Sequence, residues 1–210
     1  MSRAHSPLER LISEADHALR VLGVPAAPSA DAPPPGSGPA DPAGRALATA
    51  LMRVNHAGEV AAQALYRGQA FVARGPALRA QLLQGAAEEH AHLAACEARV
   101  RELGGHTSRL GPLWYAGSFV IGVAAGLAGN AVSLGFLAET ERQVAAHLDR
   151  HLERLPADDA RSRAIVAGMR ADEARHGAAA TAAGGIDLPR PVVAAMQAAA
   201  RVMTTLAHRV

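Results

Sequence analysis

The chain has 210 residues, which suits one domain with a substantial buried core. Its formal net charge is +2 and its arginines are scattered among acidic residues, so the charge pattern argues against binding to nucleic acid. A single cysteine, Cys96, excludes an intramolecular disulfide and fits a reducing compartment. Half of the residues are hydrophobic but only 3% are aromatic, and alanine is abundant. Because alanine favours helix and strand-like alternation is rare, we predict an all-α fold.

The first 44 residues divide into two segments. Apolar residues recur at helical spacing from about Pro7 to Leu22, which predicts a short amphipathic helix within residues 1–24. Residues 25–44 are dense in Pro, Ala, Gly and Ser and predict an extended linker. The first ten residues lack the apolar core of a signal peptide. Residues 45–210 form the predicted main domain.

Four long helices are predicted in the main domain, the first from about residue 45 to 73 and the second from 76 to 103. They are separated or ended by glycine and proline breaks at Gly75-Pro76, Gly104-Gly105, Leu155-Pro156 and Gly184-Gly185. Helices joined by so short a break are expected to be antiparallel neighbours, which gives two helical hairpins. A last helix is predicted from about residue 191 to 207.

One motif occurs twice, an acidic residue followed by Glu-x-x-His. Its copies are residues 88–92 and 172–176. Three residues turn an α-helix by about 300°, so the Glu and the His project from one face and can hold one metal ion. A further glutamate, Glu59 or Glu141, precedes each copy by about 30 residues. Within each hairpin the two glutamates lie at similar distances from the turn, so four helices can supply ligands at one level.

A glutamate plus Glu-x-x-His, present twice, is the ligand set of carboxylate-bridged di-metal sites in ferritin-like four-helix bundles. Carboxylates and imidazoles suit iron or manganese, and the absence of thiolates argues against structural zinc. Four carboxylates balance two Fe(II) ions, so a neutral cluster can lie in the bundle core. We assign Glu59, Glu89 and His92 to the first metal and Glu141, Glu173 and His176 to the second, with carboxylates bridging.

The roles of several neighbouring residues stay open at this point. Glu88 and Asp172 either accept a hydrogen bond from a coordinated histidine or are solvated helix charges. Glu139 is the rival of Glu141, but residues two apart on a helix point roughly 200° apart, and Glu141 continues the apolar spacing. His147 is expected at the surface, with a role beside the ligands or the substrate as the alternative. The other histidines of the bundle are expected to be solvent-facing or structural, namely His56, His90, His106 and His151.

Residues 110–138 carry no charge and lie in the long connection between the two hairpins. By length this stretch could span a bilayer, but a single span would separate the two half-sites by ~30 Å of hydrocarbon. Its glycines favour a bent or re-entrant element, and Trp114 and Tyr115 suit the headgroup level. We therefore expect monotopic contact with a membrane surface through residues 110–138 and a lipid-like substrate. The alternative is a buried helix whose small residues allow close packing.

Five stretches of the chain resemble the Coq7 family, the demethoxyubiquinone hydroxylases of ubiquinone synthesis, and the likeness covers about residues 45–208. The matching stretches are Leu51–Glu59, Glu89–Leu93, Pro112–Trp114, Ala138–Glu141 and Ala171–Gly177. The resemblance implies a ferritin-like di-iron monooxygenase that uses O2 to hydroxylate a prenylated benzoquinol, a demethoxyubiquinol. It also matches the family's six ligands to the six residues assigned above, with no departure.

The resemblance further implies a peripheral protein on the cytoplasmic face of a bacterial inner membrane, with partners among other proteins of ubiquinone biosynthesis. Some eukaryotic members carry a second His and a Tyr where this chain has His147 before Leu148. The alternative functions are an iron-binding or storage protein and an oxidase with a soluble substrate. The sequence leaves open the prenyl tail length, the electron donor and the oligomeric state.

Overall fold

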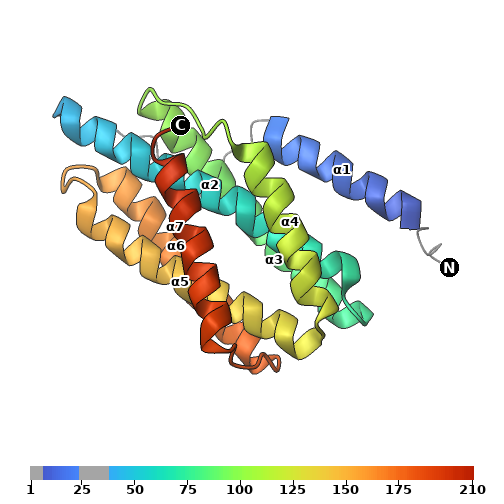
Figure 1. Cartoon of the computed structure of the whole chain (residues 1–210). Helices are drawn as coiled ribbons and strands as arrows, with labels where there is room; N and C mark the ends of the chain where they lie inside the picture. Colours follow the sequence, from blue (N-terminus) through green and yellow to red (C-terminus); the bar gives the residue numbers. More distant parts are fainter. Residues whose placement is uncertain (1–6, 24–37) are drawn as a thin grey trace.

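The computed structural model describes residues 7–23 and 38–210. These residues form seven α-helices and no strand, so the all-α prediction is confirmed (Figure 1). The helices are α1 (Pro7–Gly23), α2 (Pro42–Val72), α3 (Pro76–Glu102), α4 (Gly111–Leu127), α5 (Asn130–Arg154), α6 (Ala160–Ala182) and α7 (Arg190–Ala207). Residues 25–37 of the expected linker lie outside the described residues.

Helices α2, α3, α5 and α6 form a four-helix bundle of the ferritin-like kind. The hairpin of α2 and α3 and the hairpin of α5 and α6 are each closely packed, and α3 also contacts α6. Helix α4 is the long connection between the hairpins and packs along α2. Helix α7 lies across the bundle, where it contacts α2 and α5 (Figure 1). The predicted bundle with a long apolar crossover is therefore confirmed.

The expected helix boundaries are correct to within a few residues. Helix α2 begins at Pro42, inside the expected linker, because the Asp41 side chain caps it by accepting a hydrogen bond from the Gly44 N–H at 2.8 Å. Gly75 has a φ of 111°, a conformation that favours glycine, and Pro76 then opens α3. Gly104 and Gly184 also have positive φ and follow the ends of α3 and α6.

The glycine-rich crossover packs on α2 at very short range. A Cβ at Gly122 would lie 2.4 Å from the Leu65 carbonyl oxygen, and a Cβ at Gly68 would lie 2.3 Å from the Phe119 carbonyl oxygen. Glycine at these positions therefore lets the two backbones meet. The opposite face of α4 is apolar and exposed, and Val120 is 66% accessible. Among the described residues, no helix combines the length and apolar character needed to cross a bilayer.

Helix α1 is amphipathic, as expected, but its polar side faces the bundle. The Arg67 guanidinium donates two hydrogen bonds to the Glu14 carboxylate, at 2.6 and 2.9 Å. His17 lies 3.3 Å from the Gln63 side-chain oxygen, and Arg10 lies over the Phe71 ring. Val21 is buried against the bundle, but the larger apolar side chains of α1 point outward and are between 37% and 72% exposed: Leu8, Leu11, Ile12, Leu19 and Leu22.

Candidate metal centre

The six side chains predicted as metal ligands lie on the four bundle helices and meet in the bundle core. Glu59 is on α2, Glu89 and His92 are on α3, Glu141 is on α5, and Glu173 and His176 are on α6. The four carboxylates are at most 3% exposed. The two hairpins thus bring together at one level residues that are up to 117 positions apart.

The six residues form two overlapping groups. In each group, one ligand atom of every residue lies within 4.8 Å of the others. The groups are Glu59, Glu89, His92 and Glu173, and Glu89, Glu141, Glu173 and His176. Glu89 and Glu173 belong to both, so each hairpin contributes one carboxylate to the group centred on the other. These two glutamates are therefore the residues that the two groups share.

The histidine nitrogens that face the cluster are the Nδ1 atoms. His92 Nδ1 lies 3.1 Å from Glu89 and 3.4 Å from Glu173, and His176 Nδ1 lies 3.0 Å from Glu89. Four buried atoms of the cluster lack a hydrogen bond of good geometry: Glu59 Oε2, Glu89 Oε1, Glu173 Oε2 and His176 Nδ1, although His176 Nδ1 and Glu89 Oε1 lie 3.0 Å apart. Buried polar atoms without partners are rare, and these four are carboxylate and imidazole donors of the type that binds iron. The residues present therefore fit a di-metal centre.

The electrostatics of the cluster follow from burying four carboxylates together. Burial, and then the neighbouring Glu89 carboxylate, raises the pKa of Glu59 well above its usual value. Burial and Glu173 do the same to the pKa of Glu141. Burial alone would lower the pKa of His92, but hydrogen bonds with Glu173 and Glu89 raise it to about 12. Without a metal, protons thus neutralise part of the buried negative charge, and metal binding displaces them.

The acidic residues that precede the two motifs pair with the histidines of the opposite hairpin. His92 Nε2 lies 3.1 Å from Asp172 Oδ2, and His176 Nε2 lies 2.7 Å from Glu88 Oε2. Each carboxylate can accept the Nε2 proton, which leaves Nδ1 free to face the cluster. Of the two roles considered for Glu88 and Asp172, the structure supports hydrogen bonding to the histidines. The crossing of these contacts between α3 and α6 was not predicted.

Tyr66 is a further residue at the cluster and was missed by the sequence analysis. Its hydroxyl donates a hydrogen bond to Glu141 Oε1 at 2.8 Å, and the side chain is buried. Burial, and then the Glu141 carboxylate, raises the pKa of Tyr66, so the phenol stays protonated. Tyr66 follows Glu59 by seven residues on α2, which places both on one side of the helix. That spacing was the signal that could have found it.

The rival residues lie away from the cluster. Glu139 is paired with Arg142 at 2.7 Å and with Gln143, whereas Glu141 is 1% exposed inside the cluster. Cys96 is fully buried and makes a 3.6 Å contact with the Met169 sulfur, as expected for a small hydrophobe.

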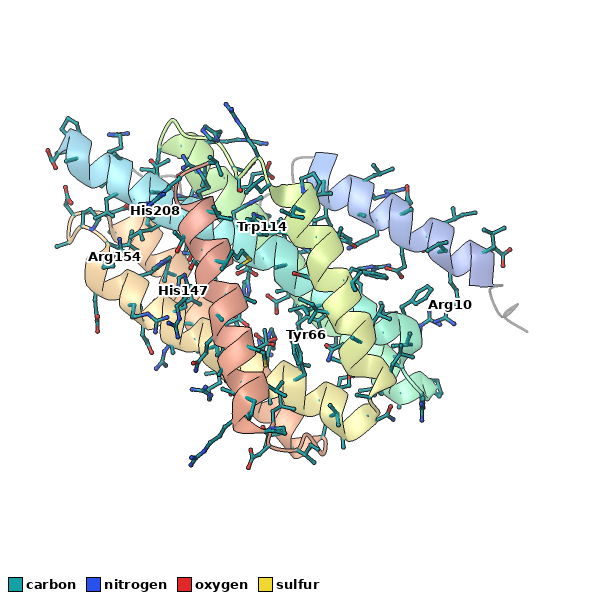
Figure 2. All side chains as sticks on the ribbon, in the orientation of Figure 1. Arg10, Tyr66, Trp114, His147, Arg154 and His208 are labelled. Carbon is teal, nitrogen blue, oxygen red and sulfur yellow. The ribbon has the colours of Figure 1, made fainter. Side chains whose placement is uncertain are left out.

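The expectation that His147 lies at the surface is wrong. His147 is partly buried between α5 and its neighbours, and its ring packs on that of His151 with centroids 4.0 Å apart. His151 is only 3% exposed and His56 is 9% exposed, so both are buried, structural residues and do not face solvent. Helix α7, whose end carries His208, covers this part of α5 (Figure 2).

Fold and site together define a ferritin-like helical bundle with a carboxylate and histidine cluster suited to two metal ions. The sequence model of the family described as ubiquinone biosynthesis protein COQ7 matches residues 46–207. The chain belongs to this family, and the resemblance noted from its motifs is confirmed.

Several curated relatives named 3-demethoxyubiquinol 3-hydroxylase are similar to most or nearly all of the chain. The protein from Polynucleobacter necessarius is 55% identical over 210 residues, covering 98% of this chain and 100% of the relative. The protein from Cupriavidus metallidurans is 55% identical over 207 residues, covering 97% and 100%. The protein from Ralstonia pickettii is 62% identical over 168 residues, covering 80% and 77%.

Proposed function

We propose that this protein is a di-iron monooxygenase that hydroxylates 3-demethoxyubiquinol with O2 in ubiquinone biosynthesis. The observation that carries the proposal is the pair of overlapping carboxylate and histidine groups in the bundle core. Full-length relatives named for this hydroxylation support the choice of substrate. The six proposed ligands are Glu59, Glu89, His92, Glu141, Glu173 and His176.

The protein's own residues would hold, orient and shield the metal pair. Glu89 and Glu173 lie between the two groups and would bridge the ions, while Glu59 and Glu141 lie at opposite ends. Asp172 and Glu88 fix the rings of His92 and His176 through their Nε2 atoms. The cluster is buried, so bulk water is kept from the reacting groups. When bound, the iron pair supplies the redox chemistry that activates O2.

The reaction balances only with a reductant. One atom of O2 replaces the hydrogen at the ring position that becomes hydroxylated, and the other leaves as water. Two electrons and two protons are consumed, so a two-electron donor is required in addition to O2. The two protons do not come from the buried glutamates and histidines of the cluster, because these residues would act as ligands once the metals are bound.

The experiment that tests the proposal is complementation of a bacterial strain whose own 3-demethoxyubiquinol 3-hydroxylase gene is deleted. We expect the wild-type chain to restore ubiquinone and to remove the accumulated demethoxyubiquinol. The Glu173→Ala variant, which loses a residue of both groups, should fold but fail to do so. If the wild-type chain is well expressed but demethoxyubiquinol still accumulates, the proposal is contradicted. An iron-storage role or an oxidase with a soluble substrate would then be favoured.

The same proposal includes contact with a membrane surface, because a prenylated quinol resides in lipid. The outer face of α4 offers four exposed apolar side chains, between 43% and 66% accessible: Leu113, Val120, Ile121 and Leu127. Helix α1 contacts α4 and exposes its own apolar side (Figure 1). We propose that α4, within the uncharged residues 110–138, lies on the cytoplasmic face of a bacterial inner membrane, where other proteins of the pathway can be met.

Flotation with lipid vesicles tests the membrane contact. Changing both Val120 and Leu127 to glutamate places two charges on the proposed lipid face, and we expect vesicle binding to be lost. The matched control is Ala167→Glu, an exposed position on α6, a bundle helix that packs on α5 and α3. Equal binding by the double variant and the control would refute a role for α4 in the contact.

A further inference from the structure

Tyr66 is held at the cluster by a cradle that accepts only glycine. Its ring lies against Gly85 of α3, where a Cβ would be 2.4 Å from Tyr66 Cε1. The side chain is 3% exposed and belongs to an apolar group with Leu82 and Leu137. Close packing around the ring therefore helps to set the position of the hydroxyl.

The hydroxyl meets one oxygen of one proposed ligand. Tyr66 Oη lies 2.8 Å from Glu141 Oε1, a normal distance for a phenol that donates to a carboxylate. Glu141 is 1% exposed. Its hydrogen-bond donor is Tyr66, which is not one of the six predicted ligands. The hydrogen bond thus engages one of the two oxygens of the Glu141 carboxylate.

Tyr66 and Glu141 also lie side by side along one narrow slot. The slot lies between α2 and α5, is lined mainly by apolar side chains and is too narrow to hold a water molecule. In the view of Figure 2, Tyr66 appears between the ribbons of α4 and α7, two of the helices that lie outside the bundle.

We propose that Tyr66 is a positioning residue that holds Glu141 Oε1 and thereby makes Glu141 a ligand through a single oxygen. The inference rests on the proposed di-metal centre and adds to it the residue that sets the coordination of its second metal. Packing alone does not require this hydroxyl, because phenylalanine would fill the same space. Burying a phenol is unfavourable unless it is hydrogen bonded, and its partner here is a proposed ligand.

The test is an anaerobic Co(II) titration of the purified metal-free chain, followed by the visible absorption of bound cobalt. We expect two Co(II) ions per wild-type chain. Tyr66→Phe should also bind two, with the second bound about tenfold more weakly and with altered absorption bands, because Glu141 is free to use both oxygens. The matched control is Tyr115→Phe, which removes the other tyrosine hydroxyl of the chain, a buried group on α4 without a hydrogen bond to any described residue.

The outcomes separate the inference from the proposed function. Wild-type protein that binds no cobalt pair would overturn both. A normal pair in wild type, with Tyr66→Phe equal to it in affinity and absorption, would overturn the role of Tyr66 alone. The same change in Tyr115→Phe would mark a general effect of losing a phenol and would also overturn it. If Tyr66→Phe does not fold, Gly85→Ala, which displaces the ring but keeps the hydroxyl, must weaken the second ion or the inference falls.

Discussion

At the scale of single residues, the choice between two glutamates on α5 is the sharpest. Glu141 lies in the cluster, whereas Glu139 lies two positions earlier and is paired with Arg142. We expect Glu141→Ala to lower bound iron and hydroxylation by more than about tenfold, since even residues that only orient ligands have effects of this size. Glu139→Ala should leave both unchanged. Iron analysis of the two purified variants decides, and equal losses would remove Glu141 from its assigned role.

The crossed contacts between α3 and α6 give a second prediction. Asp172→Asn weakens the acceptor for His92 Nε2 but leaves all six proposed ligands in place. We expect metal affinity to fall by about 10- to 100-fold while helicity stays the same. The control is Asp149→Asn, an exposed carboxylate on α5 that is paired with Arg170. Metal titrations that do not distinguish the two variants would show that Asp172 does not orient His92.

Sequence alone predicted which of the proposed ligands come together, because helical spacing puts Glu89 with His92 and Glu173 with His176 on common faces. It could not predict that Asp172 reaches His92, because that contact depends on how the two hairpins dock. Tyr66 was within reach of the same reasoning, at seven residues from Glu59, but tyrosine is not a usual ligand of such sites.

At the scale of elements, the packing of α4 on α2 predicts opposite effects for two glycines of one helix. A Cβ at Gly122 would lie 2.4 Å from a backbone oxygen of α2, so we expect Gly122→Ala to destabilise the protein by about 1–3 kcal/mol. A Cβ at Gly117 would meet nothing within 4 Å, so Gly117→Ala should stabilise the helix by up to about 1 kcal/mol.

Urea unfolding of the two glycine variants measures the change in the free energy of unfolding. A Gly122→Ala protein as stable as wild type would mean that α4 does not pack on α2 at this range. A destabilised Gly117→Ala protein would instead place a neighbour against the exposed face of α4.

The element boundaries were largely predictable because they depend on local chemistry. Gly75-Pro76 ends one helix and opens the next, since a positive φ at Gly75 suits glycine and the proline lacks an N–H to leave unpaired. The start of α2 was placed three residues late, because the cap at Asp41 lies within the proline-rich stretch. The partner of each face of α4 was not predictable, since apolar and small residues suit both lipid and a neighbouring helix.

At the scale of the whole molecule, α7 packs on α5, which carries two buried or partly buried histidines. His147 was expected at the surface, whereas His151 was expected to be solvent-facing or structural. Burial, and then His147, lowers the pKa of His151 to about 2, and burial with Arg150 and Arg154 lowers the pKa of His147 to about 4. His208, at the end of α7, adds to the effect on the pKa of His151. In the unfolded chain the pKa of both histidines returns to about 6.5. Their contribution to stability is therefore present above pH 6.5 and is lost as the pH falls, because the unfolded state then binds more protons.

This linkage predicts a stability loss on the acid side of pH about 6.5, with a slope of up to about 1.4 kcal/mol per pH unit for each buried histidine. His151→Gln should reduce the slope relative to wild type, whereas the exposed His106 changed to glutamine should not. Urea unfolding across this pH range measures both. An unchanged slope in His151→Gln would show that α7 does not bury His151 in solution.

The positions of α1 and α7 could not be predicted from the sequence, and neither could the burial of His151, because both depend on how the helices assemble. Each helix is amphipathic or apolar enough to lie on several surfaces, and only the assembled bundle selects one. The inward polar side of α1, with Glu14 bound to Arg67, reverses the usual expectation that the apolar face packs on the core.

The central claim is that two hairpins join six side chains around a pair of irons. Anomalous X-ray scattering at the iron absorption edge, from crystals of the iron-loaded chain, tests it most directly. We expect two iron peaks in the bundle core, one among Glu59, Glu89, His92 and Glu173 and one among Glu89, Glu141, Glu173 and His176. A single peak, or iron bound anywhere else on the chain while these side chains remain metal-free, would contradict the claim.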